Sequence, residues 1–398
     1  MKKKIAIFND FQRPIPPVNG GSVPNLINML LLENEEKQKF DIDIYVCENK
    51  QAREEAKHYK HTRFIFVKDA GLIRFMTNVA FKLKLPVDLS EIPFPLSVKR
   101  FYKKQNYDMV YIVGYIRGAL PIMKLSNAPC VVHHHVVTDI INEPSIKGNE
   151  IVNKADRICF VSDFARDFAK TGTDEQNAKM LTFPNAIDVS EYSGSERNTI
   201  RKTIRKSIGI KDSDIVVLFV GRLVANKSPL SLIRAFNAAR FEKNVKLVLC
   251  GGATYASKEI TPYVKACMTE AEKNSNIIMT GYISYKDMPN YYLASDIGTL
   301  LSSCNEACGL VGIECMAAGL PVICTRRGGI PEYVSQECCV SVDDGDNFEN
   351  EIKEALGLLV NNENLRAQLG ISAKHRSERY TRQNYYKSFC DLVEQVTE

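Results

Sequence analysis

Short apolar runs alternate with stretches of helical periodicity along the whole chain. The runs in the first half are KIAIF, IDIYV, FIFV, MVYIV, CVV and ICFV, and those in the second half are IVVLFV, KLVLC, IIM, GTLL and PVIC. Strands that are separated by helices form parallel sheets with right-handed crossovers. The pattern therefore predicts an α/β protein with two doubly wound parallel sheets, one in each half of the chain.

A polar stretch near residues 188–200, DVSEYSGSERNT, contains few large apolar side chains and separates the two halves. A weaker break lies near residues 375–380, before an amphipathic run over 380–396. The chain has 398 residues, which is too long for one comfortable core and fits two domains of about 150 to 200 residues. We therefore predict a first domain over residues 1–190 and a second over 191–377.

Composition excludes several classes of protein. Apolar residues make up 45% and charged residues 25% of the chain, which are globular averages and do not indicate disorder. The net charge of +5 does not indicate binding to nucleic acid, which requires a strongly basic face with readable motifs. No window approaches about 18 consecutive apolar residues, so no transmembrane helix is expected.

The first residues and the cysteines indicate a cytoplasmic location. The apolar run Ile5–Phe8 is too short for a signal peptide and predicts a buried first strand. The 12 cysteines show no disulfide-framework spacing, which indicates a reducing compartment. Four of them could suggest zinc, but they lack paired C-x-x-C knuckles, so small buried apolar residues are favoured. These four are Cys304, Cys308, Cys315 and Cys324.

The segment NEACGLVGIECMAAGLP carries two carboxylates with a glycine between them. We expect Glu306 on a loop and Glu314 in the first turn of the helix that follows. The amides of Gly309, Leu310 and Val311 would open this helix. Free amides and the helix dipole attract a diphosphate, and ionised carboxylates accept hydrogen bonds from sugar hydroxyls. The segment therefore suits a phosphorylated ligand, although a surface glutamate before an amphipathic helix is the plainer alternative.

Two cations lie at the carboxyl end of an apolar strand over residues 216–220. GRLVANKSP follows this strand, which places Arg222 and Lys227 before a predicted helix over 229–240. Open α/β sheets bind ligands at this position. A solvated basic loop is the alternative, and the strand-end position of both residues disfavours it.

Two further motifs follow strands in the first half. Gly20 and Gly21, in NGGS, precede a predicted helix and would let the backbone approach a ligand closely, although a plain turn explains them equally well. His133, His134 and His135 end the CVV strand. Neighbouring side chains of a strand point to opposite faces, so these histidines do not converge on one metal ion. One of them is expected to reach the site, and a buried histidine bonded to a carbonyl is the alternative.

GRLVANKSP, GYISYKDMPNYYLASDIG (281–298) and NEACGLVGIECMAAGLPVICTRRGGIPE (305–332) together resemble the family 4 retaining glycosyltransferases of the GT-B fold. NGGS, HHH, FPNAIDVSEY (184–193) and the terminal SERYTRQNYYKSF extend the resemblance over nearly the whole chain. The resemblance implies two Rossmann-like domains that face a cleft, the first for the acceptor and the second for a sugar nucleotide. It also implies that a last helix, within 378–398, crosses back to the first domain.

The resemblance implies roles for individual residues. Arg222 and Lys227 would neutralise the donor's diphosphate, Glu314 would hold the ribose diol, and Glu306 would hold a hydroxyl of the sugar. His135, with His134 as the alternative, would orient the transferred sugar, and Tyr282 and Ile283 would cradle the nucleobase. The expected catalytic residues are His135, Arg222, Lys227 and Glu306. The expected donor-binding residues are Gly20, Gly21, Arg222, Lys227, Tyr282, Ile283, Glu306, Gly309, Leu310, Val311 and Glu314.

The implied reaction is transfer of a hexose with retention from a nucleotide diphosphate sugar, expected to be a UDP-sugar. The acceptor would be a glycan or polyprenyl-diphosphate-linked molecule in cell-surface polysaccharide synthesis. No cofactor or metal is expected, since Asp41 and Asp43 form a DxD inside a predicted strand and are expected to share a solvent or strand-end position. The alternatives are a sugar-nucleotide epimerase, a phosphorylase and a non-catalytic binding protein of the same fold. Ala307 and Cys308 replace the family's more usual Gly-Phe, which leaves the shape of the sugar pocket open.

A basic, apolar tract over residues 72–104 could lie on an anionic membrane surface. The apolar positions Leu72, Met76, Val79 and Leu83 recur at helical spacing. The basic residues are Arg74, Lys82, Lys84, Lys99, Arg100, Lys103 and Lys104. We expect peripheral association with the inner face of the membrane, and a core-facing helix with a solvated basic side is the alternative.

Overall fold

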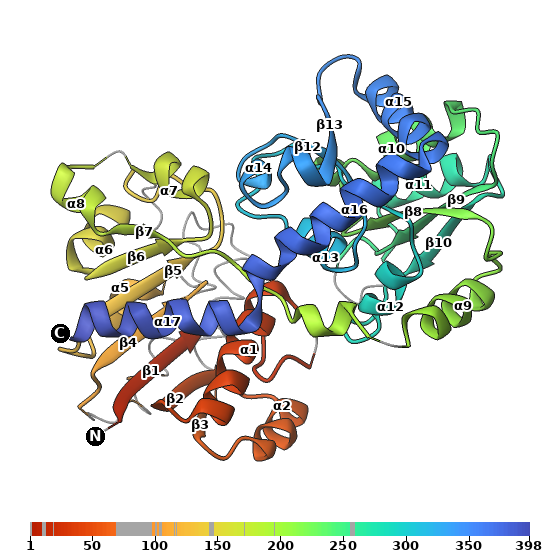
Figure 1. Ribbon diagram of the computed structural model, residues 1–398. Coiled ribbons are helices and arrows are strands. Elements are labelled where there is room, and N and C mark those ends of the chain that lie inside the picture. Colours follow the sequence, from red (N-terminus) through yellow and green to blue (C-terminus); the bar gives the residue numbers. More distant parts are fainter. Residues whose placement is uncertain are drawn as a thin grey trace. The chain divides into compact units, whose positions relative to one another are not determined.

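The chain divides into two compact units, Met1–Pro184 with Gln383–Glu398, and Asn185–Arg382 (Figure 1). The predicted boundaries, after residues 190 and 377, lie a few residues away. Asn185 donates its amide to the Tyr333 hydroxyl at 3.1 Å, which ties the start of the connecting segment to the second unit. The structure is a computed structural model that describes residues 2–9, 13–18, 20–68, 98–99, 102, 106–114, 116, 118–142, 147–170, 172–194, 196–254 and 259–398.

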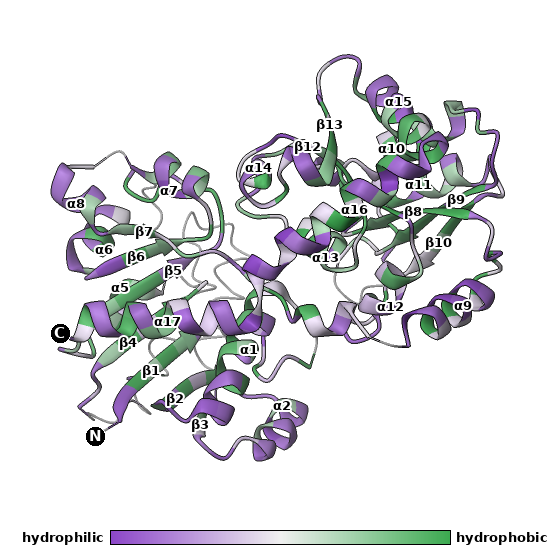
Figure 2. Cartoon of the chain, viewed as in Figure 1, coloured by the Kyte–Doolittle hydropathy of each residue, from purple (hydrophilic) through white to green (hydrophobic). Residues whose placement is uncertain are grey.

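The first unit contains a seven-stranded sheet in the order β3-β2-β1-β4-β5-β6-β7. Every pair of neighbouring strands is parallel. Apolar residues occupy most positions of the central strands (Figure 2), as is typical of strands that are covered on both faces. The strands are β1 (Lys3–Asn9), β2 (Phe40–Cys47), β3 (Thr62–Val67), β4 (Met109–Val113), β5 (Cys130–His134), β6 (Arg157–Phe160) and β7 (Met180–Thr182).

The last helix of the chain packs in the first unit, as predicted. Phe389 is fully buried on α17 (Arg382–Thr397), and its ring meets Phe40 edge-on with centroids 5.7 Å apart. Tyr386 on the same helix donates its hydroxyl to Asn34 at 2.8 Å. The other described helices of this unit are α1 (Ser22–Lys37), α2 (Lys50–Glu55), α5 (Ala119–Met123), α6 (Gly148–Lys154), α7 (Asp163–Ala169) and α8 (Asp174–Ala178).

The second unit contains a six-stranded parallel sheet in the order β10-β9-β8-β11-β12-β13. Its strands are β8 (Ile215–Val220), β9 (Val245–Cys250), β10 (Ile277–Gly281), β11 (Ile297–Leu300), β12 (Val322–Thr325) and β13 (Cys339–Val342). Its helices are α9 (Arg197–Ser207), α10 (Pro229–Ala238), α11 (Pro262–Ala271), α12 (Met288–Leu293), α13 (Leu310–Ala317), α14 (Ile330–Tyr333), α15 (Phe348–Asn361) and α16 (Glu363–Ser377). The two doubly wound sheets confirm the predicted α/β class.

Two strands were not predicted from the apolar runs. β7 has three residues and β13 has four, and each lies at one edge of its sheet. An edge strand is covered less completely than a central one, so its sequence needs no continuous apolar run. These two strands therefore gave a weaker pattern than their neighbours.

The expectation for the DxD pair was wrong for one carboxylate. Asp41 is exposed, whereas Asp43 is only 4% exposed. Arg63 donates Nε to Asp43 Oδ1 at 2.8 Å, and the Tyr107 hydroxyl donates to Oδ2 at 2.7 Å. Asp43 is buried because the neighbouring strand β3 supplies a guanidinium partner, which the strand's own sequence does not reveal.

The tract over residues 72–104 lies outside the described residues, apart from Val98, Lys99 and Tyr102. Its proposed contact with a membrane surface therefore stays a prediction. Within the ranges that the structure describes, no helix is both long enough and apolar enough to cross a membrane.

Candidate functional site

The carboxyl end of β8 turns directly into the segment that carries the two predicted cations. Gly221, with φ of 151°, follows the strand, and Leu223 donates its amide to the Gly252 carbonyl at 2.8 Å. Arg222 lies between them with an exposed side chain. A short 3-10 turn, Ala225–Lys227, then leads into α10. The chain therefore holds both cations at the strand end that the sequence predicted.

Lys227 and Glu306 form an ion pair, although they are 79 positions apart in the sequence. The Lys227 side chain is 25% exposed and that of Glu306 is 15% exposed. Ser302 donates its hydroxyl to the same Glu306 oxygen at 2.6 Å. The ends of β8 and β11 thus bring a cation, a carboxylate and a hydroxyl together.

A neighbouring loop supports the backbone of Glu306. Gly329 donates its amide to the Glu306 carbonyl at 2.7 Å. Gly328 has φ of 63°, and a Cβ added there would lie 2.2 Å from the same carbonyl oxygen. Thr325, at the end of β12, donates its hydroxyl to the Ser302 carbonyl at 2.7 Å. The close approach requires glycine at position 328, which explains the first glycine of the Gly-Gly pair in this loop.

Burial and a neighbouring charge act together on Lys227. Burial lowers the pKa of its ammonium, and the Arg222 guanidinium lowers it further. Neighbouring cations repel each other, and an anion beside them offsets this repulsion. Glu306 supplies one such charge, and a bound diphosphate would supply more.

The amides that were predicted to open a helix do so. Gly309 is the N-cap of α13 in the left-handed conformation, with φ of 79°, and offers no side-chain cap. Leu310 and Val311 are the first residues of the helix. This end of the helix presents backbone donors and the positive end of its dipole.

Glu314 lies in the second turn of α13, not in the first turn as predicted, because the helix begins only at Leu310. Its side chain is buried, and the Tyr292 hydroxyl donates to its Oε2 atom. Burial raises the pKa of the Glu314 carboxyl to about 7, in opposition to the Tyr292 hydrogen bond. Tyr192 packs edge-on against Tyr292 with ring centroids 5.6 Å apart. The carboxyl therefore sits in an aromatic pocket.

Tyr282 and Ile283 follow the end of β10, on the edge of the second sheet. Tyr282 is 39% exposed, and Ile283 is half-buried. In parallel sheets the carboxyl ends of all strands lie at the same edge. Both residues are thus at the edge that carries Arg222, with β9 between their strand and β8.

Gly20 and Gly21 lie in the first unit, just before α1. Their φ angles are 71° and 120°, both in the region that favours glycine. A Cβ on Gly21 would lie 3.1 Å from the Arg13 guanidinium. The two glycines therefore allow a backbone turn that other residues would strain.

The three histidines alternate between the faces of the first sheet, as the strand geometry predicted. The tilted rings of His133 and His135 have centroids 4.2 Å apart, whereas His134 packs edge-on against Phe160. Burial lowers the pKa of His133 to about 3 and that of His134 to about 4. The Tyr111 hydroxyl lies 2.7 Å from His133 Nδ1. His135 follows the last residue of β5 and is half-buried, so it is the most accessible of the three.

Several residues around the candidate site escaped the sequence reasoning. Ser302 and Thr325 are fully buried and support Glu306, and Tyr292 binds Glu314. Ser302 and Thr325 lie at strand ends, and this position in the sequence could have identified them. Tyr292 lies inside α12 and gave no signal by position.

The chain is similar to known proteins over most of its length. Residues 200–376 match the family described as glycosyl transferases group 1. The chain is 25% identical to the putative glycosyltransferase YtcC of Bacillus subtilis, over 94% of this chain and 88% of that protein. A shorter match, 30% identical over 52% of this chain and 51% of the other, is to the lipopolysaccharide 1,2-N-acetylglucosaminetransferase of Salmonella typhimurium.

Solved structures share the fold. HepE of Anabaena, in complex with UDP and glucose, has a TM-score of 0.73 and 17% identity, and the match covers 99% of this chain and 100% of that chain. At this identity the similarity establishes the architecture alone. It confirms the predicted GT-B fold.

Proposed function

We propose that this chain, whose residues 200–376 match the glycosyl transferases group 1, is a retaining glycosyltransferase that takes a UDP-sugar donor and makes a cell-surface glycan. A hexose moves to a glycan or polyprenyl-diphosphate-linked acceptor. The name of the Salmonella relative, a lipopolysaccharide transferase, supports an acceptor of this class. The UDP and glucose bound to HepE support the choice of donor.

The observation that carries the proposal is the ion pair between Lys227 and Glu306 beside Arg222, at the strand ends of the second sheet. A diphosphate placed there would be neutralised by Arg222 and Lys227. The first residues of α13, Leu310 and Val311, would add backbone donors. Glu306, held by Ser302, would accept a hydrogen bond from a hydroxyl of the sugar.

The reaction is a displacement on one face of the sugar. The bond from the anomeric carbon to the β-phosphate oxygen breaks, and the acceptor oxygen bonds to that carbon on the same face. The acceptor proton goes to the β-phosphate oxygen that leaves. The protein positions both substrates, and Arg222 and Lys227 stabilise the negative charge that grows on the diphosphate.

The remaining donor contacts follow from the resemblance to the family. Glu314 holds the ribose diol from its aromatic pocket, and Tyr282 with Ile283 flanks the base. Gly20 and Gly21 approach the diphosphate, and His135 orients the transferred sugar. His134 is the poorer candidate, since it is 3% exposed and its ring packs against Phe160.

The proposed reaction needs no metal, because the two cations take the role that a divalent ion has elsewhere. Among the residues that the structure describes, no group of three or more His, Cys, Asp or Glu side chains is placed to hold an ion. Activity that disappears in EDTA and returns with Mn²⁺ or Mg²⁺ would contradict this part of the proposal.

Donor hydrolysis with a panel of UDP-, GDP- and ADP-sugars tests the function as a whole. We expect release of UDP above the background of the Lys227→Ala variant. Turnover only with a GDP- or ADP-sugar would identify guanine or adenine as the base of the donor. No turnover with any donor would favour a non-catalytic binding protein. Conversion of the UDP-sugar into its epimer without release of UDP would favour the epimerase.

A further inference from the structure

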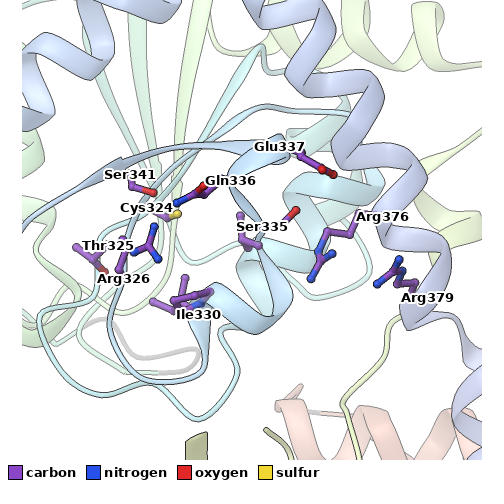
Figure 3. Close-up of a pocket in the computed structure, with 12 residues that line it drawn as sticks. Cys324, Thr325, Arg326, Ile330, Ser335, Gln336, Glu337, Ser341, Arg376 and Arg379 are labelled. Atoms are coloured by element: carbon purple, nitrogen blue, oxygen red, sulfur yellow. The ribbon is translucent and has the colours of Figure 1, made fainter. Parts of the chain in front are cut away.

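A cavity of about 500 Å³ lies in the second unit, beside the end of β12 (Figure 3). Thr325 and Arg326 line it from the end of this strand, and Ser341 lines it from β13. Ser335 comes from the segment after α14, and Arg376 lies in the last turn of α16. None of the lining residues is assigned to hold the donor, although Thr325 also supports Ser302 in the candidate donor site.

Positive charge dominates the walls of this cavity. Arg326, Arg376 and Arg379 line it, whereas Glu337 is its only carboxylate among the described residues. In the view of Figure 3, Arg326 lies on one side, Arg376 and Arg379 lie on the other, and Ser335 is between them. The charges of the lining residues therefore favour an anionic ligand.

Arg376 is held in place without being neutralised. Its Nε and Nη2 atoms donate to the carbonyls of Tyr333 and Glu332, both at 2.5 Å. Carbonyl oxygens carry no net charge, so the guanidinium keeps its full positive charge at the cavity wall. A fixed cation of this kind loses little conformational freedom when it binds an anion.

Arg326 differs from its neighbour in the same loop. Arg327 donates Nε to Asp344 at 2.7 Å, whereas no carboxylate of the described residues pairs with Arg326. Two adjacent arginines thus have different partners. Arg327 completes an ion pair, and Arg326 lines the cavity with no carboxylate partner in the part of the chain that the structure describes.

We propose that this cavity is a second binding site, which takes a small phosphorylated sugar. Guanidinium groups match the oxygens of a phosphate and bind them through charge-assisted hydrogen bonds. Hydroxyls of Ser335 and Ser341, with the amide of Gln336, offer donors and acceptors for the sugar. The volume is within the range of small-molecule sites, about 300 to 1,000 Å³.

The site adjoins the candidate donor site but does not overlap it. The loop that follows β12 forms one wall of the cavity through Arg326 and supports Glu306 through Gly328 and Gly329. The two sites thus share this loop and the supporting residue Thr325, but no residue assigned to hold the donor lines the cavity. Binding in the cavity does not depend on the function proposed for the donor site.

Calorimetric titration with glucose 1-phosphate tests the proposal, using the full chain saturated with UDP so that the donor site is occupied. We expect glucose 1-phosphate to bind, inorganic phosphate to bind more weakly, and glucose not to bind. Arg326→Gln should weaken binding about tenfold, the effect of losing one charge-assisted hydrogen bond. Because the Arg326 side chain is exposed, we expect the Arg326→Gln variant to fold normally, so its weaker binding would reflect the lost contact with the ligand.

Arg327→Gln is the matched control, because it removes the same charge from the same loop outside the cavity lining. We expect this variant to bind glucose 1-phosphate as the wild type does. Equal affinity in the wild type and in Arg326→Gln would overturn the proposal, as would an equal loss in both variants. Binding that saturating UDP or Arg222→Ala abolishes would assign the ligand to the donor site and would overturn it too.

Discussion

The strand ends of the two sheets carry different chemistry, although both sheets are parallel and doubly wound. At the end of β5, His133 and His134 are buried rings among aromatic neighbours, with pKa values lowered to about 3 and 4. At the ends of β8 and β11, Lys227 and Glu306 remain charged and partly exposed, and pair with each other. A strand-end position therefore indicates where a ligand can bind, but burial and partners decide which side chains can meet it.

The largest effect should come from the cations of the second sheet. Lys227→Ala and Arg222→Ala should each lower turnover about 10²- to 10³-fold, because charge stabilisation of the leaving diphosphate is lost. Both should also weaken UDP binding in calorimetry. Lys273→Ala is the control, since this lysine forms an exposed pair with Glu270 at 2.7 Å. If both variants bind UDP as tightly as the wild type, Arg222 and Lys227 do not bind the diphosphate.

Glu314 in the second unit and the buried histidines in the first unit should make the stability of the fold depend on pH in opposite directions. The folded pKa of Glu314, about 7, lies above its ordinary value of 4.5, so between these values the folded protein holds a proton that the unfolded chain has lost. Stability should therefore fall as pH rises through this window, by no more than roughly 3 kcal/mol. The histidines act the other way, because their folded pKa values lie below 6.5 and stability should fall as pH falls beneath it.

Chemical unfolding at a series of pH values separates the two contributions. Glu314→Gln should remove the loss of stability between pH 4.5 and about 7. His134→Gln should reduce the loss between pH 6.5 and about 4. A wild-type slope that neither variant changes would show that other groups control the pH dependence.

The two glutamates of the second unit should differ in which kinetic step they affect. Glu306→Gln should lower turnover about 10²-fold with little change in UDP affinity, because Glu306 is proposed to contact the sugar and not the nucleotide. Glu314→Gln should mainly weaken UDP binding, because Glu314 is proposed to hold the ribose. Calorimetry with free UDP and steady-state kinetics measure the two effects. An equal fall in UDP affinity in both variants would contradict the division of roles.

The smallest effect is expected at the histidines of the first unit. His135→Ala should lower turnover about tenfold, since it removes one neutral hydrogen bond to the sugar. UDP affinity should not change, because His135 is proposed to contact the sugar and not the nucleotide. His134→Ala is the comparison, and its effect should appear in the unfolding transition instead of in turnover. If turnover falls in His134→Ala and not in His135→Ala, His134 is the residue that orients the sugar.

The sequence by itself determined the fold class and the main strand ends. Apolar runs mark the central strands because both of their faces are covered, and local turn chemistry marks Gly309 as the start of α13. Arg222 and Lys227 were found because they follow an apolar strand closely. The edge strands β7 and β13 were missed, since the sequence of a short edge strand has little apolar pattern.

Only the tertiary structure decided which of these residues meet and which are buried. The pairing of Lys227 with Glu306, the aromatic pocket of Glu314 and the burial of Asp43 against Arg63 each join residues that are far apart in the chain. The same is true of the cavity lined by Arg326 and Arg376. A residue's charge and hydrogen bonds depend on its neighbours in space, and the order of strands in a sheet, not their order in the sequence, sets those neighbours.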